Sequence, residues 1–152
     1  MIEHAAARGT RRAIEWRQAD AQNLPLDDGG FDAVVCQFGA MFFADKHKAF
    51  SEVRRVLAPG GIFLFNVWDR IEDNEFAETV TLALATVFAD SPPLFLARTP
   101  HGYHDPATTL RDLAAGGYDV SRASLDTVVA RSCAANGRIP ALAYCQGTPL
   151  RS

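Results

Sequence analysis

Residues 31–69, FDAVVCQFGAMFFADKHKAFSEVRRVLAPGGIFLFNVWD, are the stretch that decides the fold of this chain. They contain, in order, an apolar run, a short turn, an amphipathic segment, a Pro-Gly-Gly sequence and a second apolar run. The apolar runs at 33–36 and 62–65 are continuous and do not alternate with polar residues, which is typical of parallel strands covered on both faces. The stretch therefore predicts a βαβ unit, in which a helix joins two parallel strands.

The helix expected between these strands has clear start and stop signals. Asp45 is a suitable N-cap, because its carboxylate can accept a hydrogen bond from the first helical turn. Pro59-Gly60-Gly61 is expected to end the helix. The apolar positions of the segment share one face: Ala49, Phe50, Val53, Val56 and Leu57. We expect this face to pack on the sheet.

Composition limits the class of protein. The 152 residues suffice for one domain, and a hydrophobic fraction of 48% supports a packed core. The formal charge of −3 gives no basic surface for nucleic acid, so we expect no nucleic-acid partner. No apolar run reaches the length of a membrane span, and the first residues lack the apolar core of a secretory signal. We therefore expect a cytoplasmic protein without a membrane partner. The three cysteines have no metal-ligand spacing, so no metal site is expected.

Outside the βαβ unit, periodicity and turn residues predict further elements. Helices are expected at 1–8, at 74–88 and at 106–115, the last capped by Asp105. Short strands are expected at 13–19 and 118–130, and a helix with a break at 137–140 is expected within 132–145. The intervening residues 89–104 form a long loop that contains Arg98, His101, Tyr103 and His104. A loop of this length with aromatic and titratable side chains is typical of a lid or binding loop.

Three short motifs occur in order around the βαβ unit. They are DAQNLP at 20–25, FDAVV at 31–35 and VLAPGG at 56–61. Together they resemble the class I S-adenosylmethionine-dependent methyltransferases, in particular the small-molecule branch that includes enzymes of the ubiquinone-biosynthesis type. In that family the first motif follows the third strand, the second forms the fourth strand and the third precedes the fifth strand. The resemblance implies an α/β fold, a Rossmann-like and mostly parallel sheet with flanking helices.

The resemblance also implies a cofactor site for S-adenosylmethionine. The Asp20 carboxylate would accept a hydrogen bond from the exocyclic amine of adenine, and the backbone N–H of Ala21 would donate to a ring nitrogen. Gln37 and Phe38, which end the fourth strand, would contact the methionine arm. The simpler interpretations are that Asp20 caps a strand end in solvent and that Gln37 and Phe38 only pack beneath a loop. The cluster at 41–43 would either face the acceptor or belong to the core.

Methyl transfer requires alignment of the acceptor with the cofactor and exclusion of water. A hydroxyl or carbon acid acceptor would in addition benefit from a general base. His104 is our candidate for that base, with His101 and Tyr103 as further candidates, and the ordinary alternative for such a histidine is a structural role. Arg98 could bind an acidic group of the acceptor, although a solvated charge is the simpler interpretation. The acceptor is expected to be a small molecule.

Several parts of the family pattern are not found in this sequence. No glycine-rich loop precedes the matched region, and the resemblance implies that the first two strands and the last strand of the family are missing. The resemblance therefore implies a single partial domain over 1–152, truncated at both ends. It would comprise a cofactor half at 13–69, a lid-like loop at 89–104 and a substrate-side segment at 105–152. A sheet of this kind would have an exposed edge, through which a homo-oligomer could form.

Three function classes remain open from the sequence. The first is a small-molecule methyltransferase that uses S-adenosylmethionine. The second is a non-catalytic or partner-dependent remnant of such a domain, and we expect the chain alone to bind the cofactor weakly or not at all. The third is another nucleotide-binding enzyme such as a dehydrogenase, for which the chain lacks a GxGxxG sequence.

Overall fold

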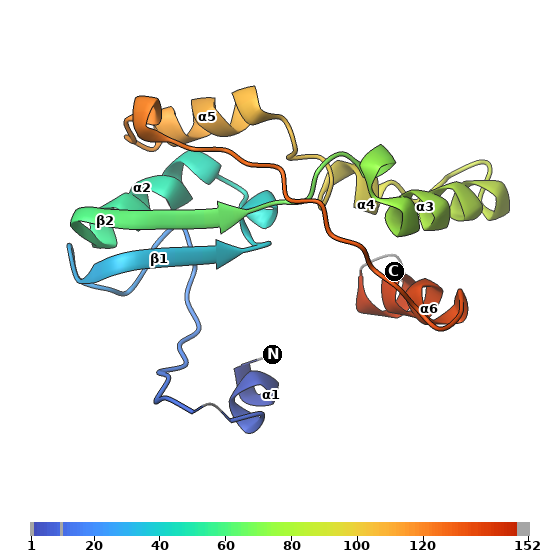
Figure 1. Cartoon of the computed structure of the whole chain (residues 1–152), viewed down its shortest axis with the longest axis horizontal. Helices are drawn as coiled ribbons and strands as arrows, with labels where there is room; N and C mark the ends of the chain where they lie inside the picture. The colour runs from blue at the N-terminus through green and yellow to red at the C-terminus, as the bar shows by residue number, and fades with distance from the viewer. Residues whose placement is uncertain (1, 10, 149–152) are drawn as a thin grey trace.

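The computed structural model describes residues 2–9 and 11–148. Met1, which belongs to the first predicted helix, lies outside the described residues. Within the described residues the secondary structure consists of two strands, six α-helices and three short 3₁₀ turns: α1 (Ile2–Ala7), β1 (Phe31–Gln37), η1 (Ala40–Phe42), α2 (Lys46–Val56), β2 (Leu57–Asn66), η2 (Ile71–Asp73), α3 (Glu75–Val87), α4 (Phe95–Arg98), α5 (Pro106–Ala115), η3 (Val120–Arg122) and α6 (Arg138–Gly147). Figure 1 shows the two strands with α2 and α5 on one side, and α3, α4 and α6 beyond the strand ends.

β1 and β2 are parallel, as the βαβ prediction requires. Val34 pairs with Phe63 and Gln37 pairs with Asn66, so the carboxyl ends of both strands lie at the same edge of the sheet. The pairing is irregular at its start, where Phe31 lies opposite Leu57 but Ala33 lies opposite Ile62. The fold class is thus confirmed as α/β with a small parallel sheet and flanking helices, a partial Rossmann-like arrangement.

The connecting helix begins where it was predicted to begin, but it ends at Val56, before the Pro-Gly-Gly sequence that was expected to end it. Asp45 is the N-cap, and its carboxylate accepts a hydrogen bond from the Lys48 N–H at 2.9 Å. The helix ends at Val56, and the Pro-Gly-Gly sequence lies in the irregular first half of β2. Gly60 has a φ of 84° there, a conformation that favours glycine. The Pro-Gly-Gly sequence therefore shapes the entry to the strand, and Leu57 is the C-cap residue of the helix.

The core lies between the covered face of the sheet and the helices α2 and α5. Phe50 of α2 is fully buried, and its ring lies 5.6 Å from that of Phe63 and 5.4 Å from that of Phe65. Leu113 of α5 belongs to the same cluster. Burying an aromatic side chain of this size contributes about 2–3 kcal/mol, so Phe50 is the anchor of the sheet–helix contact.

The opposite face of the sheet is open, which contradicts the expectation that both faces are covered. Val35 is 67% exposed, Ile62 65% and Leu64 61%. The continuous apolar runs at 33–36 and 62–65 therefore alternate in burial, because among the described residues helices pack on one face alone.

Both additional strand predictions are wrong in this structure. Residues 13–19 are exposed and extended but unpaired, and the nearest pairing is a bridge between Asp20 and Asn23. Residues 123–134 are likewise extended and exposed, after the 3₁₀ turn η3. Strand-like sequence forms a strand only where it pairs with the backbone of a neighbouring strand, and within the described part of the chain neither segment is paired in this way.

The predicted helices agree with the structure better than the predicted strands do. α3 and α5 match their predicted ranges, and the Asp105 carboxylate caps α5 by accepting from the Ala107 and Thr108 N–H groups. α6 begins at Arg138, so Pro140 lies in its first turn, where a missing N–H costs nothing, and the predicted break is instead the helix start. Within the described residues, no helix combines the length and the apolar character needed to cross a bilayer.

Candidate functional site

The carboxyl end of β1 has a strained backbone. Phe38, the residue directly after the strand, has a φ of 52°, in the left-handed region that residues other than glycine seldom adopt. Its N–H donates to the backbone oxygen of Asn66 at 3.2 Å and to Asn66 Oδ1 at 3.1 Å. The end of β2 thus holds the end of β1 in this conformation. Such strain persists only where the surroundings enforce it, and it is concentrated at functional sites.

An aromatic pair covers this end of the sheet. The Phe38 ring stacks on Trp68, which follows β2, with 4.2 Å between ring centroids and 18° between ring planes. Trp68 is 42% exposed, so part of its surface remains open to a ligand. The His101 ring lies 6.1 Å from Trp68. In open parallel sheets, ligands bind beyond the carboxyl ends of the strands, which is where these three rings lie.

The chain turns sharply between β1 and α2. A Cβ atom at Gly39 would lie 2.9 Å from Cys36 Sγ, so this position requires glycine unless the thiol moves. Of the three residues at 41–43, Met41 is buried, Phe43 packs against the core and Phe42 is 54% exposed. Met41 and Phe43 thus belong to the core, and Phe42 alone is free to contact a ligand.

Residues 20–23 form a turn, which we call the Asp20 turn, and it lies at the end of the sheet where β1 and β2 have their carboxyl ends. Asp20 Oδ1 accepts a hydrogen bond from the Gln22 N–H at 2.9 Å, and Gln22 Oε1 accepts from the Asp45 N–H at 2.9 Å. Asp45 is the N-cap of α2, and α2 begins where the chain leaves the carboxyl end of β1. Hydrogen bonds therefore join the Asp20 turn to the N-terminus of α2, which follows the carboxyl end of β1 along the chain.

A second set of hydrogen bonds holds the chain after Asp20 along α2. The Leu24 N–H donates to Glu52 Oε2 at 2.8 Å, and Arg55 donates to the backbone oxygens of Leu24 and Leu26 at 2.9 and 2.8 Å. Arg55 also forms an ion pair with Glu52 at 2.8 Å. The hydrogen bonds from Arg55 and from the Leu24 N–H lower the pKa of Glu52 to about 2. We call this group of residues the α2 clasp.

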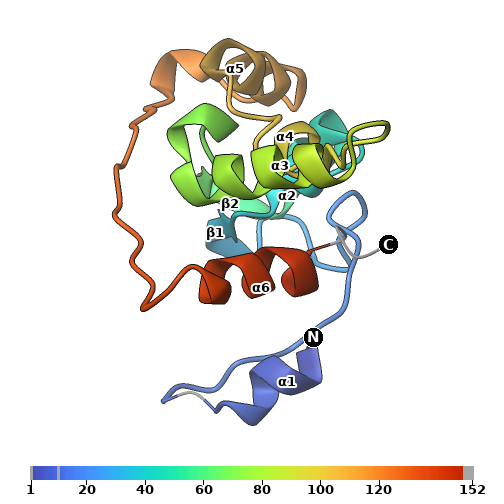
Figure 2. The same cartoon turned by 90° about the vertical axis from the view of Figure 1, so that its right-hand side faces the viewer.

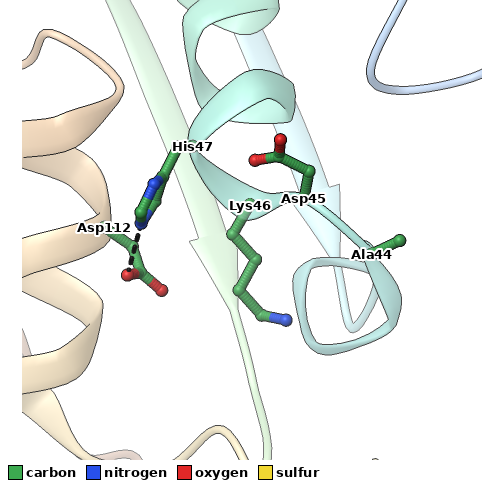
Figure 3. Close-up of a pocket in the computed structure, with 5 residues that line it drawn as sticks. All are labelled: Ala44, Asp45, Lys46, His47 and Asp112. Carbon is green, nitrogen blue, oxygen red and sulfur yellow. Dashed lines mark hydrogen bonds and ion pairs between the residues drawn. The ribbon is translucent and has the colours of Figure 1, made fainter.

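A buried carboxylate joins α2 to α5 on the other side of the helix. Asp112 is 8% exposed and accepts a hydrogen bond from the Tyr103 hydroxyl at 2.8 Å, while its second oxygen lies 3.0 Å from His47 Nε2. Figure 3 shows His47 reaching across to Asp112 beside an open hollow that Lys46 also lines. Burial and the bond to Asp112 raise the pKa of the Tyr103 hydroxyl. Tyr103 is therefore engaged in the contact between helices.

The two histidines after α4 form a chain of hydrogen bonds. His101 is 4% exposed, and its Nδ1 lies 2.8 Å from the backbone oxygen of Asp69; His104 is exposed, and its Nδ1 lies 2.8 Å from the backbone oxygen of His101. A carbonyl can only accept, so each Nδ1 carries the proton and each Nε2 of the neutral ring is an acceptor. Residues 89–104, expected as a lid-like loop, thus contain the short helix α4, and the side chains of His101 and Tyr103 in it are buried, as is Leu96 of α4.

The structure brings some of the predicted site residues together and not others. Phe38 and the Asp20 turn lie at the same end of the sheet, with Ala21 half-buried beside Asp20. Gln37 ends β1 with its side chain on the open face, and no hydrogen bond joins it to Asp20 in the described part of the chain. His104 is linked to this region through His101 and Trp68. Whether these residues bind the cofactor or act on the acceptor stays a prediction.

Sequence reasoning missed Trp68 and the Asp112 contacts. Trp68 follows β2 by two residues, as Phe38 follows β1 by one, so its position after a strand end was a usable signal. Asp112 and His47 are 65 residues apart and share no pattern that would connect them. No cluster of three metal-ligating side chains occurs among the described residues.

Comparison with known proteins finds a family match for the N-terminal part of the chain. A family model described as a methyltransferase domain matches residues 1–65, the part that includes the Asp20 turn, β1 and α2. This part of the chain is therefore similar to the methyltransferase domain family. The resemblance to class I methyltransferases is thereby confirmed. No solved structure matches the chain.

The curated relatives of this part of the chain are named as methyltransferases of quinones or quinols, or of their biosynthesis. A demethylmenaquinone methyltransferase of Thermus thermophilus is 49% identical over 63 residues, which are 40% of this chain and 29% of the relative. A ubiquinone/menaquinone biosynthesis C-methyltransferase of Caulobacter vibrioides is 41% identical over 88 residues, 58% of this chain and 32% of the relative. A mitochondrial 2-methoxy-6-polyprenyl-1,4-benzoquinol methylase of Rattus norvegicus is 37% identical over 71 residues, 47% of this chain and 22% of the relative. The chain thus spans less than a third of the length of these relatives.

Proposed function

We propose that this chain carries the cofactor-facing part of an S-adenosylmethionine-dependent methyltransferase that acts on a small molecule. One observation carries the proposal: the Asp20 turn, the strained Phe38 and the stacked Trp68 lie at the carboxyl ends of two parallel strands. Ligands bind at this place in open α/β sheets. The family match at residues 1–65 supports the same reaction class and disfavours a dehydrogenase or a non-catalytic remnant.

The hydrogen-bonding groups of the Asp20 turn fit an adenine ring. Asp20 Oδ1 is engaged with Gln22, whereas Asp20 Oδ2 and the Ala21 N–H have no hydrogen-bond partner among the described residues. An unpaired carboxylate oxygen next to an unpaired N–H is the donor and acceptor arrangement that adenine requires. In the proposal Gln37 and Phe38 orient the methionine arm. The bound cofactor supplies an electrophilic methyl group on its sulfonium, and the chain binds and orients it.

We assign the acceptor to the open side of Trp68. The relatives are named for methylation of demethylmenaquinone and of a benzoquinol, so an aromatic ring of the quinol class is the proposed acceptor. A planar ring of this kind can lie against the partly exposed indole of Trp68 by offset stacking. Residues 89–104 would cover the acceptor and residues 105–152 would form its side of the domain. We place the reaction in the cytoplasm.

His104 is the proposed proton acceptor, with His101 as its positioning residue. His101 is fixed by Asp69 and in turn orients His104, whose Nε2 is left as an acceptor. Tyr103 is excluded from this role, because it is bonded to Asp112 and its pKa is raised. Long-range proton–nitrogen NMR of the imidazoles tests the arrangement. Both rings should carry the proton on Nδ1 near pH 8, and the opposite form in either ring would contradict the assignment.

Saturation-transfer NMR with S-adenosylmethionine tests the cofactor site, because it detects millimolar binding. The adenine protons should receive saturation from the chain, and S-adenosylhomocysteine should displace the signal. In Asp20→Asn, Oδ1 can still accept from Gln22, so the turn is preserved, but an amide N–H₂ group replaces the unpaired oxygen. Affinity should fall about tenfold.

Asp27→Asn is the matched control for this experiment. Asp27 is exposed in the same segment and makes no side-chain hydrogen bond among the described residues. Its substitution should leave the adenine signal unchanged. Absence of any signal with the unmodified chain, or equal loss in both variants, would refute the proposed cofactor site.

A further inference from the structure

Residues 123–134 have the sequence of a strand but no strand partner in this structure. Every residue from 121 to 134 is exposed, and Val128 and Val129 are 85% and 91% exposed. In the described part of the chain, no hydrogen bond involves the backbone of residues 124–134. Figure 2 shows this segment standing apart from the sheet and the helices. β-branched residues with unpaired backbone groups are a ready partner for a sheet edge.

The outer edge of β1 is the complementary feature. Among the described elements, β1 pairs with β2 alone, so the backbone groups along its other edge are unpaired. Val35 is 67% exposed on the open face of the sheet beside this edge. An open edge next to an uncovered apolar face invites pairing with another strand.

We propose that residues 125–131 of a second copy of this chain add to the outer edge of β1 as an antiparallel strand. Charge fixes the register, because Arg131 placed opposite Asp32 forms a cross-strand ion pair. The same register sets Val129 opposite Val34 and Val128 opposite Val35. Residues directly opposite one another in an antiparallel pair share a face, so the partner's Val128 would extend the apolar open face.

A second copy fits this edge better than the chain's own segment does. The segment is held at both ends, by η3 packed against α5 and by α6 packed against α3. Pairing it with β1 of the same copy would require the segment to move away from the position that these contacts give it. A second copy brings its segment to the edge as a rigid body, with both anchors kept. If each copy donates its segment to β1 of the other copy about a twofold axis, the two copies form a closed dimer.

Hydrogen exchange and light scattering of the 152-residue chain over a range of concentrations test the proposal. A dimer mass at high concentration, with amide protection of residues 125–131 and of β1 that rises with dimer content, is the expected result. Protection that is independent of concentration in a monomer would show pairing within one copy and overturn the proposal. A monomer without protection, or a dimer in which residues 125–131 exchange freely, would overturn it as well.

Substitutions test the register. Val128→Asp should weaken dimerisation at least tenfold, because it places a charge on the apolar face, whereas Val87→Asp on the exposed side of α3 should change it less than twofold. Asp32→Arg and Arg131→Asp should each weaken the dimer by up to about fivefold. The double variant Asp32→Arg/Arg131→Asp should recover the original affinity. Failure of the double variant to recover, or an equal effect of the control at residue 87, would refute this register.

Discussion

Replacing Glu52 by glutamine tests the α2 clasp, because it removes the charge that Arg55 pairs with and keeps an acceptor for the Leu24 N–H. In the folded chain the pKa of Glu52 is lowered from 4.5 to about 2, first by its hydrogen bonds to Arg55 and then by that to Leu24. A pKa difference of one corresponds to about 1.4 kcal/mol, so the upper limit is about 3 kcal/mol. The side chains of Glu52 and Arg55 are 17% and 31% exposed, and solvent screening reduces the expected loss to about 1–2 kcal/mol at pH 7.

The ionisation of Glu52 determines how the stability difference between the original chain and Glu52→Gln changes with pH. A carboxylate whose pKa is lower in the folded chain stabilises it above the pKa of the unfolded chain, and this contribution is lost as the pH falls from about 4.5 towards 2. Urea unfolding of the original chain and of Glu52→Gln should therefore differ most at pH 6–7, and the difference should fall by about half near pH 3.

The clasp also predicts a local effect. Exchange of the Leu24 amide proton should accelerate in Glu52→Gln, because the acceptor of that proton loses its charge. Glu72→Gln is the control, since Glu72 is exposed and makes no side-chain hydrogen bond among the described residues. A stability difference that stays constant between pH 7 and pH 3, or unchanged exchange at Leu24, would refute the reasoning.

Three further predictions concern the packing and accessibility of single side chains. Gly102→Ala should lower the free energy of unfolding by roughly 1–3 kcal/mol in a thermal melt, because an added methyl group would overlap a backbone carbonyl of α4, and a neutral result would contradict that packing. Tyr103→Phe should cost about 1 kcal/mol in urea unfolding through the lost hydrogen bond to Asp112, and a gain in stability would contradict it. Burial raises the pKa of the Cys36 thiol, so iodoacetamide at pH 8 should modify exposed Cys133 at least tenfold faster, as peptide mass spectrometry would show, and equal rates would contradict the burial.

Local signals in the sequence were sufficient for the longer helices and for the βαβ unit, whereas the short helix α4 lies in residues expected to form a loop. The caps at Asp45 and Asp105 are side-chain to backbone hydrogen bonds within three residues, so the sequence alone contains both partners. The parallel pairing of β1 and β2 followed from the length of the connecting helix, which leaves little other choice. These features depend on neighbours along the chain.

The failed predictions concern partners that are distant in sequence. The strand-like residues at 13–19 and 118–130 have β-branched and aromatic side chains, but a strand also needs a neighbour, and propensity does not provide one. The apolar runs in β1 and β2 predict cover on both faces, whereas the covering helices are present on one face in the described chain. The contact of His47 with Asp112 could not be predicted for the same reason, because it depends on how α2 meets α5.

The α2 clasp explains why the three motifs that carry the family resemblance act as one physical unit. Glu52 and Arg55 lie directly before the VLAPGG motif, and the backbone groups they bind belong to Leu24 of the DAQNLP motif and to the next turn. The Gly29 N–H donates in turn to the Arg55 backbone oxygen at 2.9 Å, just before β1 begins with the FDAVV motif. The helix between the strands therefore positions the segment that leads out of the Asp20 turn. It follows that weakening the clasp should reduce cofactor binding through the position of Asp20, although no residue of the clasp is proposed to contact the cofactor.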